Sequence, residues 1–135
     1  MTELRPKRPF TLESLIEAAR KEDWNKVDRH LKALANKIPV LVWASAEGLS
    51  DPDGNVRDLA ASIFEATATE LAGETVTRLM RMLSDSNPFA GFRAACALFS
   101  HNIRPPEVID KLREHENDED EQVRGIARRY LAELG

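Results

Sequence analysis

Apolar residues recur along this chain at steps of three and four, the spacing of helices that bury one face. No segment shows the strict polar–apolar alternation of a half-buried strand. A first helix is expected to start at Leu12, behind the capping residue Thr11, and a second behind Asp23. Six more are expected over about 39–49, 55–71, 74–84, 88–102, 106–116 and 119–134. The pattern therefore predicts an all-α chain of about eight helices in four hairpins.

The second helices of three predicted hairpins begin with the same short motif. A polar residue lies six positions before an arginine, an apolar residue precedes that arginine, and a small residue follows it by three positions. The polar residue and the arginine of each copy are Asp51 and Arg57, Asn87 and Arg93, and Asp118 and Arg124. The arginines lie 36 and 31 positions apart, a period typical of solenoids whose helix pairs bury their apolar faces against their neighbours.

These copies resemble the HEAT repeat family, in particular the short bacterial HEAT-like repeats similar to those of phycobilisome-lyase relatives. In this family each repeat is two antiparallel helices, A and B, marked by an Asp in the A–B turn and an Arg or Lys six residues later. The resemblance implies a right-handed α–α superhelix. The expected organisation is a flexible arm over 1–10 and one solenoid domain over 11–135, with a capping hairpin over 11–38 and repeats over 39–72, 73–103 and 104–135.

Stacking of the repeats is expected to bring the three arginines close together along the A–B turns. We interpret them as a structural ladder, in which each guanidinium donates to turn carbonyls and to the neighbouring Asp or Asn. The ladder would consist of Asp51, Arg57, Asn87, Arg93, Asp118 and Arg124. An anion site is the alternative interpretation, but the paired acids leave little free positive charge for it.

The charges of the chain are unevenly distributed. Residues 1–40 contain nine Lys/Arg and six Asp/Glu, a net of +3, whereas residues 41–135 contain ten and seventeen, a net of −7. This balance argues against a protein that binds nucleic acid through its phosphates. No apolar run approaches the ~18 residues needed to span a bilayer, and no apolar signal core follows the N-terminus. A cytoplasmic protein without membrane contact is therefore expected.

Candidate chemistry is sparse. The single cysteine, Cys96, falls at a small position of a predicted buried stripe and is interpreted as a packing residue. His115 and Glu116 are similar to the His-Glu pairs with which some HEAT-like oxygenases bind a di-iron centre. In those proteins, however, the pair follows the Val-Arg of helix B and recurs in several units. With three histidines and no repeated ligand set, we expect neither a metal nor another cofactor.

Because solenoids mostly work by offering an extended surface, the favoured function is a non-catalytic scaffold that binds a protein or peptide. The exposed partner-binding candidates on the helix-B face and the repeat turns are Asp58, Glu65, Phe89, Arg128 and Arg129. Phe89 lies at a loop-to-helix entry, where a rigid aromatic side chain can anchor a partner. A monomer or a weak homodimer is expected, to which Leu131 and Leu134 could contribute. The resemblance leaves open a HEAT-fold enzyme or enzyme subunit, similar to bilin lyases or to DNA alkylation-repair glycosylases.

Overall fold

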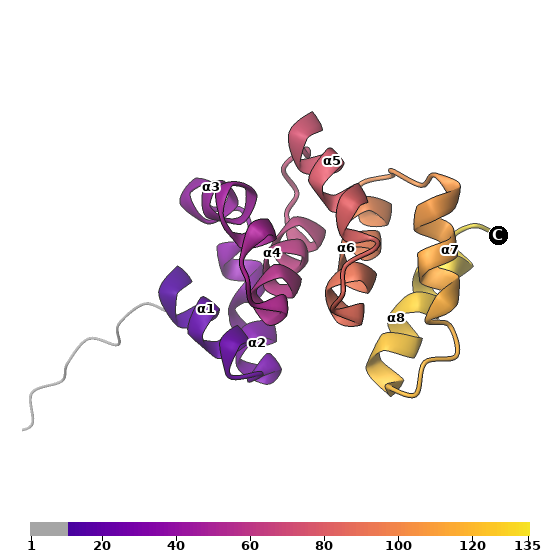
Figure 1. Ribbon diagram of the computed structural model, residues 1–135, viewed down its shortest axis with the longest axis horizontal. Coiled ribbons are helices and arrows are strands. Elements are labelled where there is room, and N and C mark those ends of the chain that lie inside the picture. Colours follow the sequence, from indigo (N-terminus) through magenta and orange to yellow (C-terminus); the bar gives the residue numbers. More distant parts are fainter. Residues whose placement is uncertain (1–10) are drawn as a thin grey trace, which may run out of the picture.

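The computed structural model describes residues 11–135, which fold into eight α-helices and one short 3₁₀ helix. The elements are α1 (Leu12–Arg20), α2 (Trp24–Leu34), α3 (Ile38–Ala46), the 3₁₀ helix η1 (Gly48–Ser50), α4 (Gly54–Ala66), α5 (Gly73–Met82), α6 (Pro88–Ser100), α7 (Pro106–Glu114) and α8 (Glu121–Ala132). In Figure 1 they follow one another along the long axis, from α1–α3 at one end to α7 and α8 at the other. The predicted all-α solenoid is confirmed, whereas the arm expected at 1–10 lies outside the described residues.

The helices α2, α4, α6 and α8, here called the B helices, all begin at a side-chain cap. The N-cap residues are Asp23, Asp53, Asn87 and Asp120, and each side chain accepts a hydrogen bond from a backbone N–H two or three positions later. Such caps satisfy N–H groups that have no partner inside the helix. In the last three turns an aspartate two positions earlier accepts the N–H of the cap residue at 2.8 Å. These three turns, which lead into α4, α6 and α8 and are called the A–B turns below, are therefore built alike.

The helix expected over 55–71 is shorter in the structure, because α4 ends at Ala66. Thr67 is extended, with ψ at 143°, and is held by Asn36 from the segment that follows α2. The Asn36 side-chain oxygen accepts hydrogen bonds from Thr67 Oγ1 at 2.9 Å and from the Ala68 N–H at 2.8 Å. A contact between residues about thirty positions apart thus ends the helix, which the local pattern could not reveal.

The helix expected over 39–49 is interrupted, since α3 ends at Ala46 and the 3₁₀ helix η1 follows. Gly48 marks the interruption. A Cβ atom at this position would lie 2.8 Å from the Ala60 Cβ and 2.9 Å from the Trp43 ring. Because glycine alone avoids these overlaps, it allows the chain to approach α4 closely before the turn.

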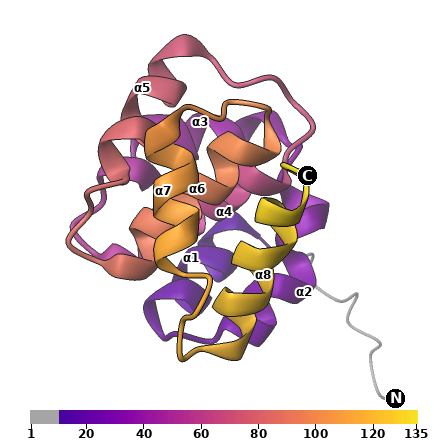
Figure 2. The same ribbon diagram turned by 90° about the vertical axis from the view of Figure 1, so that its right-hand side faces the viewer.

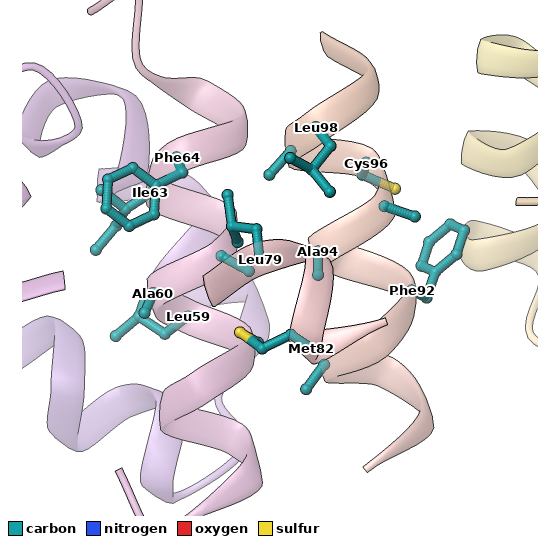
Figure 3. Packing of buried hydrophobic residues seen from close by; sticks show 14 of the residues in the cluster. Leu59, Ala60, Ile63, Phe64, Leu79, Met82, Phe92, Ala94, Cys96 and Leu98 are labelled. Atoms are coloured by element: carbon teal, nitrogen blue, oxygen red, sulfur yellow. The ribbon is translucent and has the colours of Figure 1, made fainter. Parts of the chain in front are cut away.

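The centre of the hydrophobic core is formed by α4 and α6, which pack against each other along their lengths. Figure 3 shows Ala94 and Leu98 on the side of α6 that faces α4, and Phe92 and Cys96 on the opposite side. From that opposite side the Phe92 ring contacts His115 after α7, with centroids 4.8 Å apart. A helix that is apolar all round is buried on both faces, and α6 has this character. It therefore joins the preceding repeat to the last one.

Candidate functional site

Two of the three arginines that the sequence motif singled out, Arg57 and Arg124, bind the carbonyls of an A–B turn. Arg57 Nη1 donates to the backbone carbonyls of Asp51 at 2.8 Å and Pro52 at 3.1 Å. Arg124 Nη1 donates in the same way to the Asp118 carbonyl at 2.9 Å. Each of these two arginines therefore fastens its own turn to the B helix that follows.

The middle turn has a different register from the one expected. Asp85, and not Asn87, takes the place of the turn aspartates of the other two repeats, because its carboxylate accepts the N–H of the cap residue. The residue six positions after Asp85 is Gly91, so this turn lacks the arginine that fastens the other two. The match of Asn87 and Arg93 to the repeated motif was therefore wrong by two residues.

Close packing against the end of α5 explains why a glycine occupies position 91. A Cβ atom at Gly91 would lie 3.2 Å from two backbone carbonyl oxygens at the end of α5. The turn aspartate of this repeat is instead bound from the preceding repeat: Arg57 Nε and Nη2 donate to the two Asp85 carboxylate oxygens at 2.8 Å each. Burial alone would raise the pKa of Asp85, but Arg57 and the Asn87 N–H lower it below its ordinary value. Arg57 thus joins two consecutive turns.

Arg93 occupies a position that is apolar in the neighbouring B helices. Counted from the N-cap it is the sixth residue of its helix, as Leu59 is in α4 and Ile126 is in α8. Its guanidinium lies between two acids of α4. Nη1 donates to Glu65 Oε1 at 2.8 Å, and Nε lies 3.5 Å from Asp58 Oδ1. At this position of the repeat, α6 therefore contacts α4 through charged side chains, where the neighbouring B helices carry an apolar residue.

The polar contact extends into the last repeat. Tyr130 Oη of α8 donates to Glu65 Oε2 at 2.6 Å, so that one carboxylate binds side chains from α6 and α8. We call Asp58, Glu65, Arg93 and Tyr130 the inter-repeat cluster. Arg93 Nε is buried and finds no hydrogen-bond partner among residues 11–135. The cluster links three consecutive repeats without satisfying every buried donor.

Burial dominates the electrostatics of the inter-repeat cluster. It raises the pKa of Asp58 to about 6, because the loss of hydration outweighs the attraction of Arg93. Burial also opposes the charge of Arg93, but Glu65 and Asp58 more than offset it and raise the pKa of this guanidinium. Burial, and then the charge of Glu65, raise the pKa of Tyr130. Asp58 therefore loses its charge when the pH falls below about 6.

We expect the protonation of Asp58 to change the pH dependence of the free energy of unfolding. The raised pKa means that the folded chain binds the Asp58 proton more tightly than the unfolded chain. This acid's contribution to the free energy of unfolding therefore falls as the pH rises from about 4 to about 6. Asp58→Asn should gain stability relative to the wild type across this interval, by up to about 3 kcal/mol for two pKa units. Urea denaturation of both proteins between about pH 4 and pH 7 measures the difference.

The variant Asp110→Asn controls for the change in net charge, because it removes an exposed carboxylate of α7. The difference in the free energy of unfolding between variant and wild type cancels the contributions of groups whose pKa is lowered in the fold, such as Asp85 and Asp118. A difference for Asp58→Asn that stays constant with pH would contradict the raised pKa.

Two residues expected at the surface lie inside. Asp58 is 7% exposed and Glu65 is partly buried, so their exposure was predicted wrongly. The reason is that α4 is enclosed by α1, α2, α3 and α6, which leaves it no solvent face. Because both acids bind Arg93, neither offers a free carboxylate to a partner or a substrate.

The other three candidates lie at the surface. Phe89 is 48% exposed in the first turn of α6. Arg128 Nε donates to the Glu116 carbonyl at 2.8 Å and Nη2 to the Asn117 side chain at 3.1 Å, so Arg128 fastens the α7–α8 turn. The exposed Arg129 guanidinium lies 5.2 Å from the centroid of the neighbouring Tyr130 ring.

The outward side of α8 forms a shallow, open hollow. Its lining residues are Asp120, Glu121, Gln122, Gly125, Ile126 and Arg129. A Cβ atom at Gly125 would meet nothing within 4 Å, so the middle of this side is uncovered. Figure 2 looks onto this end of the solenoid, where α7 and α8 lie nearest the viewer. The hollow is a surface that a partner could cover, and it is too open to enclose a small molecule.

The side chains considered for catalysis or metal binding have other contacts. His115 Nδ1 pairs with Asp118 at 2.9 Å while its ring packs on Phe92. Burial raises the pKa of the Cys96 thiol well above its ordinary value, which disfavours the reactive thiolate. Within residues 11–135 no three His, Cys, Asp or Glu side chains are grouped so that they could hold a metal ion. None of the eight helices described is both long and apolar enough to cross a bilayer.

Comparison with known families identifies one match. The sequence model of the family described as HEAT repeats matches residues 44–132, from within α3 to the end of α8. The match includes all three A–B turns and leaves α1 and α2 outside. No curated protein and no solved structure matches the chain significantly.

Proposed function

The chain belongs to the HEAT repeat family, and on this premise we propose that it is a non-catalytic interaction module that binds a protein or peptide partner. HEAT repeats are commonly protein-interaction modules, because stacked helix pairs offer an extended surface. The two acids that could have supplied chemistry, Asp58 and Glu65, are bound to Arg93 in the inter-repeat cluster. Recognition at the surface is therefore favoured over catalysis.

The exposure of Phe89 is the observation that carries this proposal. The rest of α6 is enclosed, since residues 90–99 are buried apart from the partly buried Arg93. Phe92 lies three positions later on the same face and packs on His115 beside the α7–α8 turn. Phe89 thus continues this aromatic row beyond the fold into solvent. Aromatic side chains held by a rigid helix are typical anchors of protein interfaces.

The chemistry of the adjoining α7–α8 turn indicates the kind of partner. The acidic residues of this turn and of the first position of α8 are Glu116, Asp118, Glu119, Asp120 and Glu121. Asp118 and Asp120 accept backbone hydrogen bonds, while Glu119 and Glu121 are exposed. A matching partner segment presents an apolar side chain to Phe89 and Lys or Arg side chains to the turn.

Phe89→Ala should weaken partner binding by at least about tenfold while leaving the melting temperature nearly unchanged, because the removed ring is half exposed. Tagged wild type and variant are purified from the native source, and mass spectrometry identifies a protein present in stoichiometric amount with the wild type. Calorimetric titration of that purified protein against both forms then gives the ratio of dissociation constants.

Leu134→Ala serves as the matched control, since Leu134 is an exposed apolar residue after α8. It should leave binding unchanged. Equal capture of the partner by the wild type and Phe89→Ala would place the site elsewhere on the solenoid. A large drop in the melting temperature of Phe89→Ala would show instead that the ring is part of the core.

A further inference from the structure

A shallow notch lies between the first two repeats, where η1 and α5 come together. Its lining residues are Leu49, Ser50, Arg78, Arg81, Met82 and Asp85. Leu49 and Met82 are buried, whereas Ser50 and Arg81 are exposed. A few polar groups beside apolar side chains are typical of a surface that binds one charged or polar group. The notch is therefore a candidate binding site, separate from Phe89 and from the hollow on α8.

One positive charge of the notch has no counter-ion. Arg78 Nη2 pairs with Glu74 Oε1 at 3.0 Å, and Asp85 pairs with Arg57 at 2.8 Å. Arg81 forms no ion pair or side-chain hydrogen bond with another residue of the described chain. A carboxylate balances this single charge, whereas a phosphate group would bring up to about two negative charges. The charges therefore favour a carboxylate ligand.

The arginines of the notch can donate to such a ligand. Arg78 Nη1 donates to the backbone carbonyl of Ser45 in α3, so that this guanidinium is held between α5 and α3. A guanidinium has about five N–H donors, and Arg78 keeps some of them for a ligand. Arg81 follows three positions later on α5, and the exposed Ser50 contributes a hydroxyl from η1. Two guanidinium groups near each other are a typical partner of a carboxylate, because each can form charge-assisted hydrogen bonds.

The next repeat lacks a free cation at the matching position. The buried residues that align α5 with α7 are Thr75 and Leu79 in α5, and Val108 and Leu112 in α7. In this alignment Lys111 and Glu114 replace Arg78 and Arg81. Lys111 Nζ pairs with Glu114 Oε2 at 3.0 Å, so their charges cancel. Stacking of the repeats therefore does not require a second cation, and Arg81 is suited to a contact outside the fold.

The notch and Phe89 belong to the same A–B turn. Asp85 accepts the Asn87 N–H at 2.8 Å, and the Asn87 side chain accepts the Phe89 N–H at 3.0 Å. The acidic α7–α8 turn belongs to the following repeat, and in Figure 1 the repeats follow one another along the long axis. The notch, Phe89 and the acidic turn thus form one surface with a basic end, an apolar middle and an acidic end.

We propose that the notch binds an Asp or Glu side chain of the partner segment, which then carries its acidic and its basic residues on opposite sides of one apolar residue. The inference rests on the proposed partner surface near Phe89 and specifies the chemistry of its other end. Packed helices lie about 10 Å apart, so two repeats span about 20 Å, the length of about six extended residues. Opposite charges at the two ends of the surface favour one orientation of the bound segment.

Selection from a phage library of random dodecapeptides, on the immobilised full chain at low salt, tests the proposal. The wild type should enrich peptides that carry Asp or Glu on one side of an apolar residue and Lys or Arg on the other. Arg81→Glu should enrich peptides without the acid, because it reverses the unpaired charge of the notch. The matched control is Arg29→Glu, which makes the same change at an exposed position of α2 and should select the same peptides as the wild type.

Calorimetric titration of one enriched peptide measures the contact directly. Replacing the acid of the peptide by its amide should weaken binding to the wild type about fivefold, and Arg81→Gln should weaken binding of the unchanged peptide by a similar factor. The two changes together should cost little more than either one alone, because both remove the same ion pair. Arg81 is exposed, and thermal melting verifies that each variant folds.

The outcomes separate this inference from the proposed function. If the wild type and Arg81→Glu enrich the same peptides, with or without an acid, the notch does not bind a carboxylate, while the interaction module stands. Effects of the two changes that simply add would also overturn the inference. If the wild type enriches no peptide, the proposed peptide-binding function fails, and this inference fails with it.

Discussion

Replacing Arg93 with alanine should lower the free energy of unfolding at pH 7 by about 4 kcal/mol, the largest effect expected from a polar side chain in this protein. The guanidinium is bound between Glu65 and Asp58, and the Arg93 side chain is only 21% exposed. Its removal leaves two carboxylates in a region with little water. Breaking a buried pair costs far more than the pair itself contributes, because the remaining charge has no compensation.

The loss should be smaller at pH 5 than at pH 7. The pKa of Asp58 is about 6 in the intact protein, so this acid takes up a proton as the pH falls through that value. Without Arg93 its pKa rises further, since the attraction that lowers it is gone. Urea denaturation of Arg93→Ala and wild type at both pH values measures the two losses, with unfolding followed by circular dichroism.

A neutral version of the cluster provides the control. The triple variant Asp58→Asn, Glu65→Gln and Arg93→Met keeps side chains of similar volume and removes all three charges. It should recover most of the stability that Arg93→Ala loses, because uncharged replacements of a buried ion pair are often neutral. If the triple variant were as unstable as Arg93→Ala, lost packing and not uncompensated charge would account for the effect.

The helices and their starts could be predicted from the sequence because the signals are local. The caps Asp53 and Asp120 precede apolar stripes of helical period, and both helices start where the pattern predicts within two residues. The middle turn offered two polar residues, Asp85 and Asn87, and a nearby arginine fitted the second. Choosing between them depends on the contact from Arg57 in the preceding repeat, which no local motif contains.

The inter-repeat cluster was missed for a related reason. Helical periodicity identifies a polar face but cannot tell whether a neighbouring helix covers it, and the acids of α4 were therefore assigned to solvent. One signal was available: Arg93 is the single charged residue between Pro88 and Ser100, in a helix apolar on all sides. Because charged residues are almost never buried without a partner, such an arginine predicts acids on an adjacent helix. Asp58 and Glu65, seven positions apart on one helical face, meet that requirement.

Arg57 and Arg124 occupy matching positions, yet their replacement by alanine should have unequal effects. Arg57→Ala should cost about 3 kcal/mol, because it removes two bonds to a turn aspartate whose side chain is only 8% exposed. Arg124→Ala should cost about 1 kcal/mol, the contribution of one hydrogen bond to a carbonyl of its own turn. Urea denaturation of the two variants under identical conditions gives both values.

A double-mutant cycle between Arg57→Ala and Asp85→Asn then isolates the contact between the repeats, with an expected coupling of about 2 kcal/mol. Equal losses for the two arginines, or a coupling near zero, would show that each arginine acts only within its own turn. In a solenoid, stability is close to a sum of single-repeat terms and neighbour terms. The difference between Arg57 and Arg124 therefore measures a neighbour term that the last arginine cannot contribute, because no turn follows it in the described chain.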